Sequence, residues 1–69
     1  MMFHFRPPLI KIINIIEEKG YYVVPNKIKD KYIANIYFNG ELLKKGTIIY
    51  ETHLDCLKAS YEKLYDIYK

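Results

Sequence analysis

The chain of 69 residues is near the lower size limit for a domain that folds alone, and such a chain buries only about 60 % of its unfolded surface. Its hydrophobic content of 51 % excludes an intrinsically disordered chain. A net charge of +3, from 11 basic and 8 acidic residues, is weaker than the charge of dedicated nucleic-acid-binding domains. The frequent Ile, Lys, Asn and Tyr indicate a low-GC genome.

The single cysteine, Cys56, excludes an intramolecular disulfide framework and a four-cysteine zinc site. Residues 1–6 lack the basic start of a signal peptide. The longest apolar run, residues 9–16, is interrupted by Lys11 and Asn14 and is far shorter than the roughly 20 residues that span a bilayer. We therefore expect a cytoplasmic protein that does not associate with membranes.

The first elements in chain order are a leader and a helix. Residues 1–6 are expected to form a flexible leader or a short extra strand, and residues 8–19 a helix. Pro8 suits a helix start, because proline lacks the N–H group that would be unpaired there. Apolar residues recur at helical spacing up to Ile16, and Gly20 is placed to end the helix in the left-handed conformation.

Three strands are expected next. Residues 21–24 are β-prone, residues 25–31 read as a polar loop, and residues 32–38 are the clearest strand. Asn39-Gly40 predicts a tight hairpin turn, which sets Tyr37 opposite Leu42 and Ile36 opposite Leu43 in a return strand over residues 41–50, with a bulge near Gly46. The face predicted to lie in the core carries Tyr32, Ala34, Ile36, Phe38 and Leu43.

The last helix is expected to start at Thr52, because Thr52 and Asp55 resemble a capping box. Its predicted inner stripe comprises Leu54, Leu57, Tyr61, Leu64, Tyr65 and Tyr68, whereas Cys56, Ser60 and Ile67 are expected to lie away from the core. The predicted fold is a single α+β domain of order α-β-β-β-α, with both helices on one face of a three-stranded antiparallel sheet.

Candidate catalytic groups are few. His53 and Cys56 are three residues apart at a helix start, where a thiol pKa would be lowered, so a reactive thiol or a metal site is a minor alternative. The carboxylate pairs, Glu17-Glu18 and Glu62 with Asp66, lie on expected solvent faces. No glycine-rich phosphate loop is present. We therefore expect no enzyme activity, no cofactor and no metal.

A binding role is the main prediction. The outer sheet face is expected to present Ile33, Tyr37, Leu42 and Lys44 to a protein partner, either a host protein or a second copy, because tyrosine is favoured at interfaces. The alternative is nucleic-acid binding through Lys27, Lys29, Lys31 and Lys45, with tyrosines interleaved.

The order α-β-β-β-α resembles the double-stranded RNA-binding domain, and residues 32–68 are similar to its C-terminal half. That family contacts phosphates through a basic cluster at the start of its second helix. Here that start reads Thr52-His53-Leu54-Asp55-Cys56 and contains no lysine or arginine.

A second resemblance covers most of the chain: a helix followed by Lys19-Gly20-Tyr21-Tyr22, a strand ending in Asn39-Gly40, and a helix that starts at Thr52. In this pattern the chain resembles small accessory proteins of phages and prophages, among them anti-CRISPR proteins. The resemblance implies an inhibitor that binds a host defence nuclease and occludes its surface. It assigns no individual residues.

Overall fold

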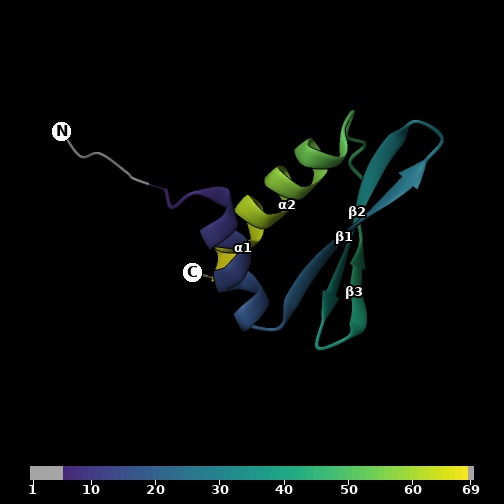
Figure 1. The fold of residues 1–69 in the computed structure, drawn as a ribbon. Coiled ribbons are helices and arrows are strands. Elements are labelled where there is room, and N and C mark those ends of the chain that lie inside the picture. The colour runs from purple at the N-terminus through teal and green to yellow at the C-terminus, as the bar shows by residue number, and fades with distance from the viewer. Residues whose placement is uncertain (1–5, 69) are drawn as a thin grey trace.

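The computed structural model describes residues 6–68. Its elements are α1 (Leu9–Glu18), β1 (Tyr21–Ile28), β2 (Lys31–Phe38), β3 (Glu41–Lys45) and α2 (His53–Tyr68). The strands form one antiparallel sheet in the order β1-β2-β3. Both helices lie on the same side of it (Figure 1). The predicted α+β class is therefore confirmed. The expected leader at residues 1–6 lies outside the described residues, apart from Arg6.

The helix ends follow the predicted capping signals. The carbonyl of Pro8 accepts hydrogen bonds from the backbone N–H groups of Lys11 and Ile12, which starts α1. Gly20 has a φ of 98° and closes that helix in the left-handed region, as expected. At the start of α2 the hydroxyl of Thr52 accepts a hydrogen bond of 3.0 Å from the backbone N–H of Asp55.

The first strand is longer than predicted. The expected loop at residues 25–31 is wrong, because β1 continues through Pro25, which pairs with Ala34, to Ile28. Proline is tolerated here because β1 is an edge strand and the nitrogen of Pro25 faces away from β2. A two-residue turn at Lys29-Asp30, with Lys29 at a φ of 58°, then leads into β2.

The third strand contains a bulge that the sequence did not place correctly. Tyr37 pairs with Leu42 as predicted, but Ile36 pairs with Lys44 instead of Leu43. The extra residue is therefore at Leu43 and not near Gly46. Because a bulge shifts the side-chain alternation by one residue, Lys44 joins Ile36 on the helix-covered face, and its predicted place on the outer face is wrong.

Beyond Lys45 the chain leaves the sheet earlier than the predicted boundary at residue 50. The N–H of Gly46 donates to the carbonyl of Ala34 at 2.6 Å, and Tyr50 exchanges two backbone hydrogen bonds with Tyr32. A Cβ atom at position 46 would collide with the backbone of Ala34. Glycine is thus required at position 46 for close approach to β2.

The core lies between the helices and the inner face of β1 and β2. Its buried members are Ile12, Ile16, Val23, Ala34, Cys56, Tyr61 and Leu64. Tyr32 and Ile36 pack against this cluster, which confirms the predicted inner face of β2. Phe38 and Leu43 were also expected in the core, but both are exposed.

The buried face of α2 is rotated relative to the predicted stripe. Cys56 and Ser60 were expected to point away from the core, yet both are buried, whereas Leu54 is exposed. The reason is that α2 packs against two partners, α1 on one side and the strands β1 and β2 on the other. A helix between two surfaces buries a wider arc than one apolar stripe. Ile67 is exposed, as predicted.

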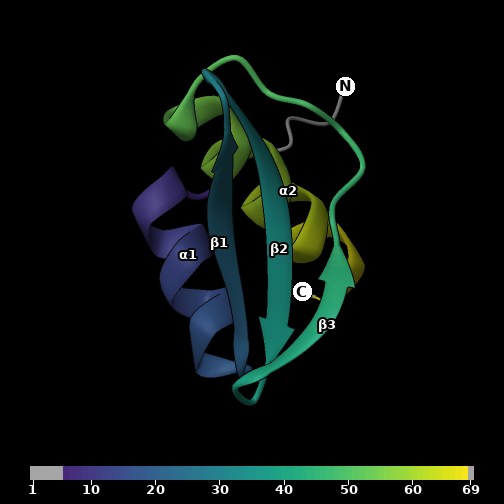
Figure 2. The same ribbon diagram turned by 90° about the vertical axis from the view of Figure 1, so that its right-hand side faces the viewer.

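The third strand stands apart from the helices. Within residues 6–68, neither α1 nor α2 packs against β3, and all five of its residues are exposed. Figure 2 shows β3 at the edge of the sheet, with the helices behind β1 and β2. The helical layer is thus narrower than the sheet that it covers.

The hydroxyl of Tyr61 connects the helices to the sheet. It accepts a hydrogen bond of 3.1 Å from the backbone N–H of Val23 and donates one of 2.9 Å to a carboxylate oxygen of Glu17. Tyr61 is only 2 % exposed. Burial, together with the neighbouring carboxylate of Glu17, raises the pKa of Tyr61 to about 12, although the bond from Val23 acts in the opposite direction.

Aromatic and ionic contacts fasten the end of α2. The ring of Tyr21 stacks on Tyr68 and is tilted against Phe38, with centroid distances of 4.6 Å in both pairs. Arg6 donates two hydrogen bonds to the carboxylate of Asp66, at 2.8 and 2.9 Å. These contacts hold the C-terminal turns of α2 near the start of β1 and near the residues that precede α1.

The close approach at Gly46 yields a first prediction. Gly46→Ala should lower the free energy of unfolding by roughly 1–3 kcal/mol, because the new methyl group must push residues 46–50 away from Ala34. Urea denaturation measures this change. Gly40→Ala is an informative contrast: Gly40 has a positive φ, of 87°, and open space around its Cβ position, so backbone strain and not a collision should lower its stability. An unchanged free energy of unfolding for Gly46→Ala would show that residue 46 does not lie tightly against Ala34.

The Tyr61 hydrogen bonds yield a second prediction. Tyr61→Phe should lower the free energy of unfolding by about 1–3 kcal/mol, since the N–H of Val23 would be left buried without an acceptor. Urea denaturation of Tyr37→Phe provides the control, because Tyr37 lies on the opposite side of the sheet and should change stability by less than about 0.5 kcal/mol. Equal effects of the two substitutions would contradict the role given to the Tyr61 hydroxyl.

A third prediction concerns alkaline pH. The pKa of Tyr61 is about 12 in the folded chain and about 10 in the unfolded chain, so the unfolded state loses this proton first. The contribution of Tyr61 to stability should therefore be complete below pH 10 and be lost as the pH rises from about 10 to about 12. Urea denaturation across this range should give a shallower pH dependence for Tyr61→Phe than for the wild type. Identical slopes would exclude this linkage.

Candidate functional site

The face of the sheet that the helices leave uncovered is the main candidate for a binding surface. Side chains alternate along a strand, so the pairs opposite one another across the sheet share a face. Tyr22 pairs with Tyr37, which in turn pairs with Leu42, and these three residues form a row across all three strands. We define the open sheet face by this row and its neighbours on the same side: Tyr22, Val24, Asn26, Ile28, Lys31, Ile33, Asn35, Tyr37, Leu42 and Lys45.

This open sheet face is apolar and accessible. Figure 2 views the sheet from this side, with both helices behind it. Tyr22, Val24, Ile28 and Leu42 are each between 46 and 51 % exposed. Ile33 and Tyr37 in the central strand are half-buried between their neighbours. The solvated face of an antiparallel sheet usually carries polar residues, so this composition is unusual for a face in contact with water.

Asn35 is a polar residue at the centre of the face. It lies between Val24 on β1 and Lys45 on β3, and its side-chain oxygen is covered but has no hydrogen-bond donor within residues 6–68. An acceptor left in this state costs about 1–3 kcal/mol. Asn35 therefore destabilises the centre of the sheet relative to an apolar side chain at the same position.

The structure separates the four residues predicted for a protein interface. Ile33, Tyr37 and Leu42 lie on the open sheet face, whereas the bulge at Leu43 places Lys44 on the other side. Tyr22, Val24 and Ile28 were missed for two reasons. Residues 21–24 form a predicted strand whose register against residues 32–38 the sequence does not fix, and Ile28 lies in the predicted loop at residues 25–31. The alternation from Tyr22 to Ile28 was the available signal, and it becomes readable once Pro25 is accepted in an edge strand.

The lysines predicted for nucleic-acid binding do not form one surface. Lys27 and Lys31 flank the β1–β2 turn, but Lys27 pairs with Tyr32 and Lys31 with Ile28, so they start from opposite faces of the hairpin. Lys31 donates to both carboxylate oxygens of Glu51, at 3.0 and 2.8 Å. The ion pair and the adjacent Asp30 raise the pKa of Lys31.

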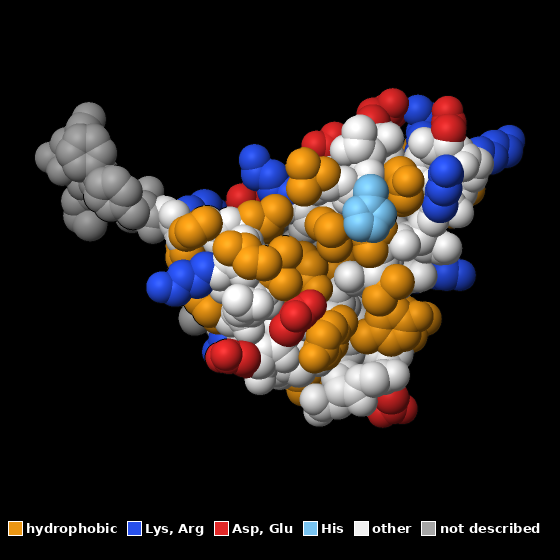
Figure 3. Space-filling view, in the orientation of Figure 1, with side chains coloured by type: hydrophobic (Ala, Val, Ile, Leu, Met, Phe, Trp, Pro, Cys, Tyr) orange, Lys and Arg blue, Asp and Glu red, His pale blue; other side chains and the backbone are white. Residues whose placement is uncertain are grey.

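The remaining members of that set are also dispersed. Lys29 occupies the turn itself, and Figure 3 shows basic and acidic side chains mixed at that end of the molecule. Lys45 was expected near the same end, but it pairs with Asn35, four residues from Lys31 and thus roughly 13 Å along the strand. Nucleic-acid binding through these four lysines stays a prediction, and the lysines do not form a concentrated basic patch.

His53 and Cys56 lie in different environments. Cys56 is fully buried, and burial raises the pKa of its thiol, an effect only partly offset by a hydrogen bond with Ser60. The expectation of a lowered thiol pKa at the helix start is therefore wrong. His53 is exposed, and its ring stands at right angles to that of Tyr32, with a centroid distance of 5.5 Å.

Other site classes find no support in the described part of the chain. Residues 6–68 contain no group of three His, Cys, Asp or Glu side chains arranged to hold a metal ion, and His4 lies outside this range. No helix within the same residues is both long and apolar enough to cross a bilayer.

Comparison with known proteins finds no relative of this chain. No protein-family model matches the chain, and no curated protein sequence or solved structure is significantly similar to it.

Proposed function

We propose that this domain is a non-catalytic accessory factor that captures a protein partner on its open sheet face. The observation that carries the proposal is the exposure of four large apolar side chains, Tyr22, Val24, Ile28 and Leu42, on one uncovered sheet surface. Contiguous apolar surface of this kind marks interaction sites in soluble proteins. On a sheet face that contacts only water, these exposed apolar side chains would contribute little to the stability of the fold.

The arrangement of the side chains suits a binding surface. The row Tyr22, Tyr37 and Leu42 places two tyrosines side by side, and tyrosine is a frequent source of binding energy at interfaces. The row is carried by paired strands, so partner binding would require little ordering of the backbone. Lys45 supplies a polar rim at the β3 side.

An inhibitor role extends this proposal. The resemblance to small phage and prophage proteins implies occlusion of a host defence nuclease, and a rigid apolar surface is sufficient for occlusion because no reaction has to be catalysed. The extension is supported by that resemblance alone, whereas the binding surface is supported by the exposed residues themselves.

A double substitution tests the surface. Tyr37→Thr with Leu42→Thr retains β-prone side chains while it removes two of the apolar contacts. Affinity for a captured partner should fall by at least about thirtyfold, since loss of a residue central to an interface costs roughly 2 kcal/mol or more. Affinity purification from host cells, followed by titration of the purified partner, measures the change.

The control replaces two exposed apolar residues on the helices. Ile10→Gln with Leu54→Gln changes side chains that are 67 and 61 % exposed on the opposite side of the molecule. This control should bind the partner like the wild type, and thermal denaturation should show both variants folded. Retained binding in the sheet variant, or equal loss in both, would refute the assignment of the open sheet face.

A further inference from the structure

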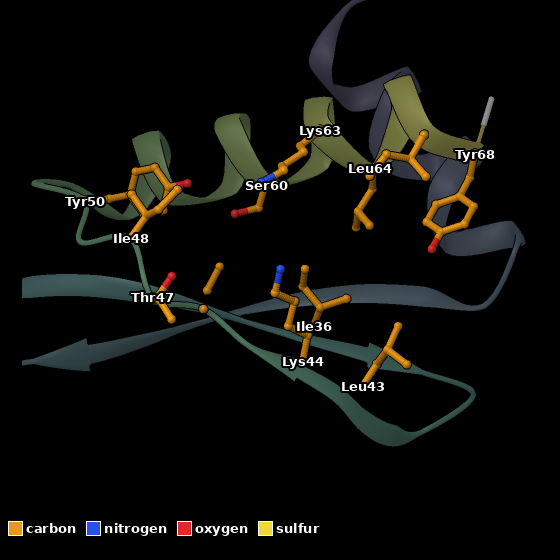
Figure 4. A pocket seen from close by; sticks show the side chains of 13 residues that line it. Ile36, Leu43, Lys44, Thr47, Ile48, Tyr50, Ser60, Lys63, Leu64 and Tyr68 are labelled. Atoms are coloured by element: carbon orange, nitrogen blue, oxygen red, sulfur yellow. The ribbon is translucent and has the colours of Figure 1, made fainter.

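A second feature, on the other side of the sheet, is a cleft between α2 and β3. It has a volume of about 350 Å³. Its walls are mainly apolar: Ile36, Leu43, Ile48, Leu64, Ile67 and Tyr68. The cleft exists because β3 and residues 46–50 extend beyond the helical layer. One wall of the cleft is formed by α2, and the facing wall is formed by the sheet and residues 46–50 (Figure 4).

Two lysines contribute to this cleft from opposite walls. In Figure 4 the side chain of Lys44 rises from β3 toward α2, and that of Lys63 runs along α2 toward Ser60. No Asp or Glu side chain is among the residues that line the cleft. Within residues 6–68, neither lysine has a carboxylate partner, in contrast to Arg6 and Lys31. The cleft thus combines apolar walls with two uncompensated positive charges.

We infer that the α2–β3 cleft binds a small amphipathic anion, an unbranched apolar chain that ends in a carboxylate. The apolar walls would take the chain, and the ammonium groups of Lys44 and Lys63 would hold the anionic head. This inference concerns a different surface from the open sheet face and does not depend on the proposed protein partner.

The volume indicates the size of the ligand. A volume of about 350 Å³ lies at the lower end of the roughly 300–1,000 Å³ that is usual for small-molecule pockets. Decanoate, with an unbranched ten-carbon chain and one carboxylate, is therefore a suitable probe of the cleft.

Titration of the full chain with decanoate, followed by NMR chemical shifts of the backbone amides, tests the inference. We expect saturable binding of one decanoate, with shifts confined to β3, residues 46–50 and the second half of α2. Octanoate should bind about tenfold more weakly, because two fewer methylene groups are buried. Decanol and decyltrimethylammonium should bind at least about tenfold more weakly than decanoate, because neither carries an anionic head.

Adjacent lysines provide a matched pair of variants. Lys44→Met removes a charge that faces the cleft, whereas Lys45→Met removes one from the next residue, on the open sheet face. Decanoate affinity should fall about tenfold in the first and stay unchanged in the second, and decanol binding should be the same in both. Lys63→Met, with Lys11→Met as its helical control, gives a second independent pair.

Several outcomes would overturn the inference. These are the absence of saturable decanoate binding, equal binding of the three ten-carbon probes, and equal effects of Lys44→Met and Lys45→Met. Binding of a short peptide of alternating leucine and glutamate, without binding of decanoate, would assign the cleft to a polypeptide instead and would equally reject a small-molecule site.

Discussion

The hydroxyl of Tyr61 joins three elements at one buried point, and the arrangement of the domain depends on this contact. The hydroxyl accepts a hydrogen bond from the N–H of Val23 on β1 and donates one to the carboxylate of Glu17 on α1, and Tyr61 itself is part of α2. A domain of this size has a small core, so one buried polar group with both hydrogen bonds satisfied fixes the relative positions of helices and sheet more specifically than apolar packing alone.

This anchor explains where the remaining surfaces are. Because Val23 donates its outward N–H to Tyr61 and Pro25 has none, the free edge of β1 offers no continuous row of donors to another strand. The same contact holds α2 beneath β1 and β2, so β3 remains without a helix beneath it. The cleft beside β3 and the open face of the sheet are both consequences of two helices that are anchored toward one edge of the sheet.

The parts of the fold that the sequence predicts are those set by local chemistry. Gly20, the Asn39-Gly40 turn and the cap at Thr52 each act within a few residues, and each appears in the structure as expected. The failures concern long-range context. Pro25 is tolerated because β1 turned out to be an edge strand, and Cys56 is buried because α2 packs against α1 as well as the sheet. Neither condition is visible in the residues around those positions.

The bulge at Leu43 had the largest effect on the predicted sites, because one extra residue reverses the faces of every later side chain in the strand. It decides which side each of two adjacent lysines takes, with Lys44 at the cleft and Lys45 on the open sheet face. The two proposed sites therefore share the strands β2 and β3 but no side chain. Since neither helix packs against β3, a ligand in the cleft would add support that this strand otherwise lacks, and would thereby also steady Leu42 at the margin of the opposite face. Any coupling between the two surfaces would pass through β2 and β3, because residues of both strands alternate between the cleft and the open sheet face.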